Sequence, residues 1–157
     1  MPSRRELIQM SKDEVREFLR TNKTIIINSI GPGGYPHPMP MWFAVDDDGT
    51  VRMTTFRKSQ KVRNIERDAK VSLLVESGEE YSQLRGVVLF GKARVVDDLA
   101  VVTQTLLAIS GFGDTADPAA RKGAEAAVAK TAAKRVAILI RPEKIVSWDH
   151  SKLGGSY

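Results

Sequence analysis

The start of the chain alternates polar and apolar positions at the spacing of a helix. Its apolar members are Val15, Phe18 and Leu19, three or four residues apart. Ser11 precedes them, and Glu14 follows Ser11 by three residues, which is the pattern of a capping box. This pattern predicts an amphipathic helix over residues 12–20.

Beyond this helix, β-branched runs and period-two alternation dominate the chain. The predicted strands cover residues 24–30, 36–45, 51–56, 71–76, 86–96, 135–140 and 144–148. Turn residues separate them at 31–34 (GPGG) and 46–49 (DDDG), and Arg141 and Pro142 divide the last two. In the 86–96 segment, Val87, Leu89, Ala93 and Val95 would face one way, and Lys92 and Arg94 the other.

Three further helices are predicted between and after these strands. The first covers residues 60–67, with Ser59 as its N-cap. The second follows Leu99, Val102, Leu106 and Ile109, and the third covers 118–134, where alanine predominates. Because the third has few large apolar residues, we expect it to be peripheral or packed against a partner. Many strands, short turns and outer helices predict a mainly β protein, an antiparallel barrel with α additions, in one domain over residues 1–157.

Length and composition exclude several classes of protein. With 157 residues the chain can bury a core without crosslinks, and it has no cysteine for a disulfide, a thiolate metal site or a thiol nucleophile. It has no apolar run long enough to span a membrane, and the opening MPSRRELIQM lacks the apolar region of a secretory signal. We therefore expect a cytoplasmic protein without a membrane span.

The net charge of +5 could attract an anionic partner, although a solvated surface explains it equally well. The positive charge is concentrated in one stretch, at Arg57, Lys58, Lys61, Arg63, Arg67 and Lys70. No nucleic-acid motif is present, and aromatic residues are not interleaved with the basic ones. Nucleic acid is therefore not the expected partner.

Three prolines at alternate positions mark the second predicted strand. Pro36, Pro38 and Pro40 remove three N–H donors from one edge of that strand. This edge could simply be protected against aggregation. Alternatively, a planar ligand could lie beside it, with Met41 and Trp42 as soft contacts.

The segment from Thr54 to Asn64 runs from a strand through a loop into a helix. Hydroxyl groups, cationic side chains and free helix N–H groups would converge there, which suits a phosphate group. Lys58 and Lys61 would act as point charges, and Ser59 could donate its hydroxyl. The alternative is a solvated basic helix with a serine cap. No glycine-rich P-loop is present.

Trp148 and His150 would share a face if the last strand continued. A single histidine near the end of a chain is more often inert than catalytic, and His37 is the only other one. The spacing of these two histidines gives no signal of a metal site, so none is expected, and no Ser-His-Asp triad can be argued.

Four blocks carry a family resemblance. They are TIIINSIGPGGYPHPMPMWF (24–43), MTTFRKSQKVRNIERDAKVSLLVE (53–76), YSQLRGVVLFGKARVV (81–96) and RVAILIRPEKIVSWDHSKLGG (135–155). In order and spacing they resemble the pyridoxamine 5′-phosphate oxidase-like split barrels, most closely the branch described as deazaflavin-dependent oxidoreductases. The blocks cover most of the chain except the helical stretch near 97–134.

The resemblance implies a six-stranded split β-barrel (the FMN-binding split barrel) and a homodimer with two cofactors at the subunit interface. By position, the phosphate motif corresponds to Lys58, Ser59, Lys61 and Asn64, after Thr54 and Thr55 of the preceding strand. The strand along the cofactor ring corresponds to Pro38, Met39, Pro40, Met41 and Trp42. Trp148, His150 and Lys152 correspond to a C-terminal segment that reaches the site from the other subunit.

The chain also departs from the family pattern. The substrate-binding arginine and histidine pattern of true pyridoxamine phosphate oxidases is not evident, so a role in vitamin B6 synthesis is not implied. Ser59 stands where relatives often carry arginine, which leaves FMN and the deazaflavin coenzyme F-420 both open. The basic side chains of Arg57, Lys58, Lys61 and Arg63 favour the deazaflavin, whose tail is longer and more anionic.

These features favour an oxidoreductase that transfers two electrons, as hydride, to a small organic substrate. The cofactor supplies that chemistry, and His150 is the first candidate for a proton donor. A carrier or sensor that binds the cofactor without turnover is the alternative.

Overall fold

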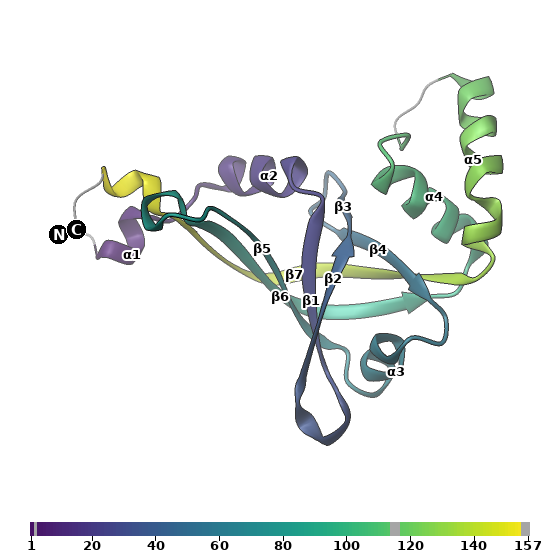
Figure 1. The fold of residues 1–157 in the computed structure, drawn as a ribbon, viewed down its shortest axis with the longest axis horizontal. Coiled ribbons are helices and arrows are strands. Elements are labelled where there is room, and N and C mark those ends of the chain that lie inside the picture. Colours follow the sequence, from purple (N-terminus) through teal and green to yellow (C-terminus); the bar gives the residue numbers. More distant parts are fainter. Residues whose placement is uncertain (2, 114–116, 155–157) are drawn as a thin grey trace.

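One curled antiparallel sheet organises the chain in the computed structural model, which describes residues 1, 3–113 and 117–154 (Figure 1). Its strands are β1 (Thr24–Ile30), β2 (Pro36–Trp42), β3 (Ala44–Val45), β4 (Val51–Phe56), β5 (Lys70–Ser77), β6 (Arg85–Val96) and β7 (Arg135–Asp149). The α-helices are α1 (Arg4–Leu7), α2 (Lys12–Thr21), α3 (Gln60–Arg67), α4 (Leu99–Ile109) and α5 (Pro118–Ala132). Short 3₁₀ turns are η1 (Pro32–Gly34), η2 (Tyr81–Gln83) and η3 (His150–Leu153).

The sheet closes on itself through Phe43. Its strand order is β2-β1-β5-β6-β7-β4-β3, so β2 and β3 lie at opposite ends of the order. Yet only Phe43 separates them along the chain, so the two edges of the sheet meet at this buried residue. The expected strand 36–45 is thus split in two. The predicted split barrel is confirmed, with seven assigned strands formed by six chain segments.

The last strand corrects the sequence reading. Residues 135–140 and 144–148 were expected as two strands, but β7 runs unbroken through Arg141 and Pro142. Pro142 has no backbone N–H to donate, and it is tolerated because the pairing of β7 with β4 has already ended at Ile140. On its other side, the pairing of β7 with β6 shifts register between Phe90 and Gly91. A Cβ on Gly91 would lie 2.8 Å from the Arg141 carbonyl oxygen, so the close approach at this bulge requires glycine.

The main core fills the concave side of the sheet, and α2 covers part of it. Val15, Phe18 and Leu19 are buried there, and Ser11 and Glu14 form the predicted capping box. The alternation predicted for 86–96 is confirmed, with Val87, Leu89 and Ala93 buried, Val95 half-buried, and Lys92 and Arg94 exposed.

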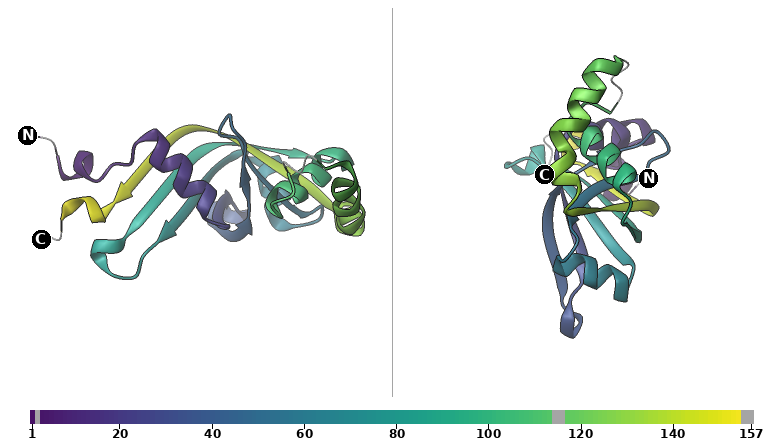
Figure 2. Two further views of the ribbon diagram at one scale, coloured as in Figure 1. Left: turned by 90° about the horizontal axis from the view of Figure 1, so that it is seen from above. Right: turned by 90° about the vertical axis from the view of Figure 1, so that its right-hand side faces the viewer.

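The helices α4 and α5 form a hairpin at one end of the molecule, opposite the two termini (Figure 2). A second small core joins this hairpin to the sheet through Val102, Ala132 and Ala137. Ala132 is the one buried residue of α5, which agrees with the expected peripheral helix. The four-residue helix α1 was not predicted. Among the described helices, none has the length and apolar character that a membrane crossing needs.

Candidate functional site

A cluster of buried polar side chains lies where β4 leads into α3. It is formed by Ser29 of β1, Thr54 and Thr55 of β4, and Lys61 and Asn64 of α3. Lys61 and Asn64 share one face of α3 because they are three residues apart. Four of these five residues belong to the segment that the sequence singled out, and α3 has the predicted bounds.

Lys61 is the unusual member of this cluster. Its ammonium donates a hydrogen bond of 2.9 Å to Thr55 Oγ1, which in turn donates to Ser59 Oγ at 3.3 Å. Only 7% of Lys61 is exposed. Burial, and then the positive charge of Arg135, lower the pKa of the Lys61 ammonium below its ordinary value.

A second cation, Arg135, reaches the cluster from β7. It pairs across the sheet with Phe56, and its guanidinium carbon lies 4.6 Å from the centroid of the Phe56 ring. The guanidinium donates to the carbonyl and hydroxyl oxygens of Thr54, both at 3.3 Å. Within the described part of the chain, no carboxylate forms an ion pair with Lys61 or Arg135. Two cations and several hydroxyls without a counter-ion are suited to bind an anion.

Sequence reasoning did not find Arg135. The signal was available only through strand pairing, since Arg135 starts β7 and lies opposite the last residue of β4. The order of the strands in the sheet, which the residue pattern did not fix, decides that pairing.

Ser59 occupies the predicted N-cap position but does not cap the helix. It has extended backbone angles, yet its hydroxyl accepts from Thr55 rather than from an N–H of α3. The first-turn N–H groups of α3 therefore keep their capacity to bind an acceptor.

Asn64 connects α3 to the sheet. Its amide nitrogen donates to Ser29 Oγ at 3.0 Å, and its oxygen accepts from Gln60 at 2.8 Å and Arg67 at 3.3 Å. Asn64 is fully buried. These contacts hold the face of α3 that carries Lys61 against β1.

The other cations of the basic stretch differ in their availability. Arg57 forms two hydrogen bonds of 2.7 Å to the carboxylate of Asp97, which lowers the pKa of Asp97 and raises that of Arg57. Lys58 and Arg63 are exposed, and among the described residues neither has an ion-pair partner. Arg57 is therefore already neutralised, while Lys58 and Arg63 are available to an anion.

The proline-bearing strand β2 pairs along its full length with β1, and it ends the strand order. Because the ladder to β1 is unbroken, the donors that Pro36, Pro38 and Pro40 lack face the open edge. Met41 packs on the core, whereas Trp42 is 71% exposed and Met39 lies partly exposed. The expected ring-binding strand is thus an open edge with an exposed indole at its end.

The C-terminal candidates lie far from α3 within one chain, at the end that carries η2 and α1 (Figures 1 and 2). The His150 ring lies 4.4 Å from the Tyr81 ring, and its Nδ1 lies 3.0 Å from the Tyr81 carbonyl oxygen. Lys152 donates to Glu14 at 2.7 Å, a contact that together with the Ser11 cap lowers the pKa of Glu14 to about 2. Trp148 packs over Gly86. One chain therefore does not bring His150, Trp148 or Lys152 to Lys61, and residue 155 of the fourth block lies outside the described part.

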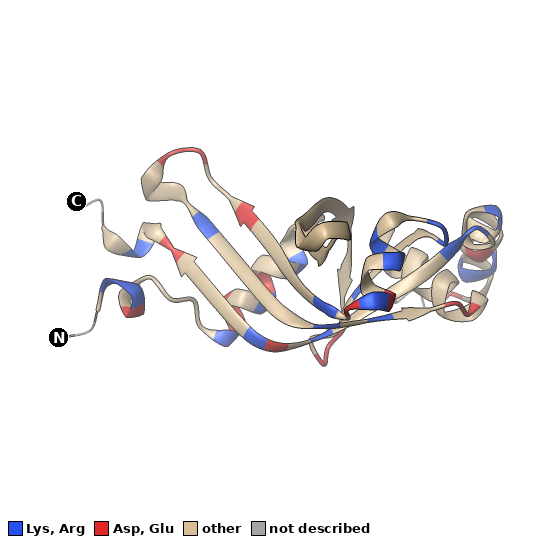
Figure 3. Cartoon of the chain, turned by 90° about the horizontal axis from the view of Figure 1, so that it is seen from below, with Lys and Arg blue, Asp and Glu red and all other residues tan. Residues whose placement is uncertain are grey.

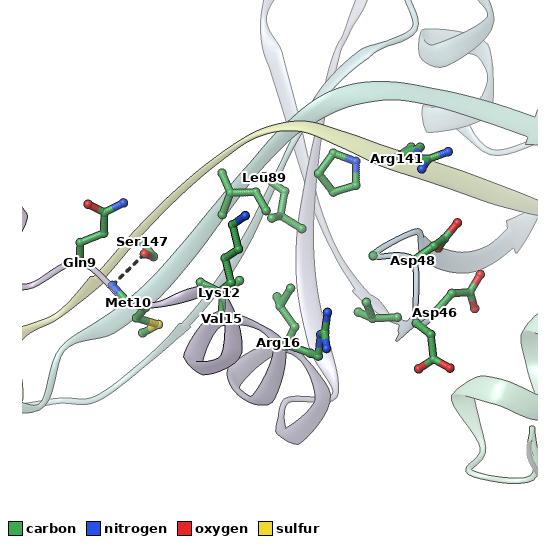
Figure 4. A pocket seen from close by; sticks show the side chains of 16 residues that line it. Gln9, Met10, Lys12, Val15, Arg16, Asp46, Asp48, Leu89, Arg141 and Ser147 are labelled. Carbon is green, nitrogen blue, oxygen red and sulfur yellow. Dashed lines mark hydrogen bonds between the residues drawn. The ribbon is translucent and has the colours of Figure 1, made fainter.

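A cavity of about 440 Å³ opens between α2, the 46–49 turn and strands β6 and β7 (Figure 4). Leu89 and Ile145 supply apolar walls, while Lys12, Arg16 and Asp48 contribute charges. The cavity shares no residue with the Lys61 cluster. Sequence reasoning missed it because turn and helix meet there only in the folded chain.

The curled sheet and the buried strand-to-helix site define a split barrel. Residues 11–149 match the family model described as pyridoxamine 5′-phosphate oxidase, and the chain belongs to this family. It is 34% identical to a crystal structure of the conserved hypothetical protein Rv2991 from Mycobacterium tuberculosis, with a TM-score of 0.86 over 99% of this chain and 95% of that one. No curated protein sequence matches the chain.

Other solved structures share the fold at lower identity. A structure titled F420 Reductase is 25% identical, with a TM-score of 0.60 over 83% of this chain and 94% of that one. A FAD-binding protein from Mesorhizobium loti is 17% identical, with a TM-score of 0.60 over 88% and 93% of the two chains. At 17% identity the likeness to the FAD-binding protein shows the fold alone.

Proposed function

We propose that this protein is an oxidoreductase that holds the phosphate group of a flavin-type cofactor between Lys61, Arg135 and the N-terminus of α3. The observation that carries the proposal is the buried Lys61 ammonium, which has a hydroxyl partner and a second cation nearby but no paired carboxylate. A buried charge without a counter-ion is costly, and a bound phosphate would remove that cost. Thr54, Thr55 and Ser59 supply hydroxyl groups around the same point.

The deazaflavin coenzyme F-420 is the preferred cofactor, and FMN is the alternative. Lys58 and Arg63 are exposed beside the phosphate site and suit the long anionic tail of the deazaflavin. Because Arg57 is neutralised by Asp97, we now assign the tail to these two residues. The 25% identity to a structure titled F420 Reductase supports the same choice.

The cofactor ring would lie along the open edge of β2, beside Pro38, Met39, Pro40, Met41 and Trp42. When bound, the cofactor supplies two-electron hydride transfer to a small organic substrate. The chain's own residues would bind the phosphate, orient the ring and exclude water. Proton donation is assigned to His150, which would act, with Trp148 and Lys152, on the site of a second copy in a homodimer.

Spectral titration of the apo-protein with coenzyme F-420 and with FMN tests this proposal. We expect saturable binding of the deazaflavin, which inorganic phosphate weakens in wild type but not in the Lys61→Ala variant. Reduced cofactor with a panel of quinones, unsaturated lactones and nitro compounds then separates an oxidoreductase from a carrier. Binding of neither cofactor would overturn the proposal, and binding without turnover would favour a carrier or sensor. Unchanged turnover in His150→Ala would remove His150 as proton donor.

A further inference from the structure

The cavity between α2, the 46–49 turn and strands β6 and β7, which we name the α2 cavity, has apolar walls (Figure 4). Val15 and Leu89 line it and are buried, and Ile145 pairs with Leu89 across the sheet. Although Ile145 thus lies on the same side of the sheet as a core residue, 49% of it is exposed. A volume of about 440 Å³ falls within the usual range of small-molecule sites. These walls suit the apolar body of a small ligand.

The 46–49 turn brings three carboxylates to the lining of the α2 cavity, and this turn is acidic in Figure 3. Two of the three are already paired with arginines. Asp46 accepts a hydrogen bond of 2.6 Å from Arg52, and Asp47 accepts one of 2.6 Å from Arg20. Each of these two carboxylates is therefore neutralised by its own arginine.

The third carboxylate, that of Asp48, is balanced in a different way. It accepts a hydrogen bond of 2.9 Å from the backbone N–H of Thr50. That bond and the Thr50 side chain lower the pKa of Asp48, and the positive charge of Arg141 on β7 lowers it further. The carboxylates of the lining thus need no other cation.

Two cations of the lining remain without a carboxylate. Lys12 and Arg16 lie four residues apart on α2, and Lys12 extends from the helix toward β7 (Figure 4). Both are exposed, and within the described part of the chain neither forms an ion pair.

The stability of α2 does not explain these two cations. Lys12 is the first residue of the helix, where the helix dipole disfavours a positive charge. Like charges four residues apart on a helix also repel one another, as Lys12 and Arg16 do. An anion bound between the two side chains would offset both effects.

Ser147 adds a hydrogen-bond donor to the lining. Only 8% of it is exposed, and its hydroxyl oxygen accepts a hydrogen bond of 3.1 Å from the backbone N–H of Met10 (Figure 4). Among the described residues, no group accepts the proton of this hydroxyl. Ser147 can therefore donate to a polar atom of a molecule in the cavity.

We propose that the α2 cavity is a second ligand site, which binds a small carboxylate with an apolar body. The carboxylate lies between Lys12 and Arg16, the apolar body contacts Leu89 and Ile145, and Ser147 is a further donor. The site goes beyond the proposed function, because none of its residues belongs to the Lys61 cluster.

Isothermal titration calorimetry of the full chain with benzoate, 2-naphthoate and octanoate tests this site. The uncharged 2-naphthalenemethanol has the same rings as 2-naphthoate without its charge. One variant carries Lys12→Ala with Arg16→Ala, and a second carries Ile145→Asp. The control carries Lys122→Ala with Lys130→Ala, two exposed lysines of α5 outside the cavity. Circular dichroism verifies that each variant is folded.

We expect at least one of the three carboxylates to bind wild type saturably, with one molecule per chain. The Lys12 and Arg16 double variant should weaken this binding by about tenfold or more, and so should Ile145→Asp. The control pair should stay within about twofold of wild type. The affinity should fall with salt, and 2-naphthalenemethanol should bind at least about tenfold more weakly than 2-naphthoate.

Several results would overturn the inference. They are binding of none of the three carboxylates, equal binding of the alcohol and 2-naphthoate, or unchanged affinity in the Lys12 and Arg16 double variant. Loss of carboxylate binding in Lys61→Ala would place the ligand in the phosphate site instead, and would overturn it as well. Carboxylate binding that persists in a protein that binds neither coenzyme F-420 nor FMN would keep this site and remove the proposed cofactor.

Discussion

Lys61 and Thr55 are joined by a 2.9 Å hydrogen bond in which a buried ammonium meets a hydroxyl group rather than a carboxylate. Thr55 cannot neutralise the charge, and the neighbouring Arg135 adds a second one. In the absence of an anion this arrangement should cost stability, and with an anion it should supply affinity. Cofactor affinity and the stability of the apo-protein report these two consequences separately.

Lys61→Ala should weaken cofactor affinity far more than it slows turnover. Loss of a charge-assisted hydrogen bond costs about 1.5–3 kcal/mol, or about 10–150-fold in the dissociation constant. Turnover at saturating cofactor should change by less than about threefold, because the reacting ring lies elsewhere. Fluorescence titration and steady-state rates measure the two quantities. Lys122→Ala, an exposed lysine on α5 away from the site, is the control and should cost less than about 0.5 kcal/mol. If Lys61→Ala bound the cofactor as tightly as wild type but turned over slowly, Lys61 would instead act in the hydride-transfer step.

Lys61→Met should leave the apo-protein at least as stable as wild type at neutral pH. The difference in the free energy of unfolding between the two proteins should depend on pH. Burial lowers the pKa of Lys61 in the folded state, so the folded chain loses this proton before the unfolded chain does. Wild-type stability should therefore rise relative to Lys61→Met as the pH rises through the lowered pKa toward the ordinary value of 10.5.

Urea unfolding of both proteins from neutral to alkaline pH measures the difference in their free energies of unfolding. Groups that titrate in the same way in both proteins do not contribute to this difference. Inorganic phosphate at neutral pH should stabilise wild type and leave Lys61→Met unchanged. A difference that stays flat with pH would show that the ammonium is well solvated or well paired.

Much of the site was readable from local sequence because one contiguous segment builds it. The strand, the loop and the helix from Thr54 to Asn64 are consecutive, so the pattern of hydroxyls and cations placed Thr55 and Lys61 together before pairing was known. Asn64 hydrogen-bonds to Ser29, Gln60 and Arg67, and its contact with a phosphate stays a prediction.

The rest of the site depends on contacts between distant segments. Arg135 is far from Thr54 in sequence, and the pairing of β4 with β7 alone brings them together. The neutralisation of Arg57 by Asp97 likewise joins two separate segments. A hydrophobic pattern specifies which residues face inward, but not which strands become neighbours. The pattern also predicted a break at Pro142, where the sheet instead uses a bulge opposite Gly91.

Asn64→Ala should destabilise the protein by about 1–3 kcal/mol, since it removes buried hydrogen bonds and leaves the Ser29 hydroxyl without its donor. Urea unfolding of the apo-protein measures the change. Arg63→Ala, on the exposed side of the same helix, should stay within about 0.5 kcal/mol of wild type. An equal loss of stability in both variants would mean that helix propensity, and not the hydrogen bond from Asn64 to Ser29 of β1, decides the stability of this helix.

Gly86→Ala should displace Trp148 from the convex face of the sheet. A Cβ at position 86 would lie 2.1 Å from Trp148 Cζ2, so the indole must move and the packing should lose about 1–3 kcal/mol. In a Trp42→Phe background, the remaining tryptophan emission should shift toward that of a solvated indole. Gly123→Ala is the matched control, because a Cβ there meets no atom within 4 Å and the position lies inside α5. That control should gain up to about 1 kcal/mol from helix propensity. An unchanged emission spectrum in Gly86→Ala would show that Trp148 does not lie over Gly86.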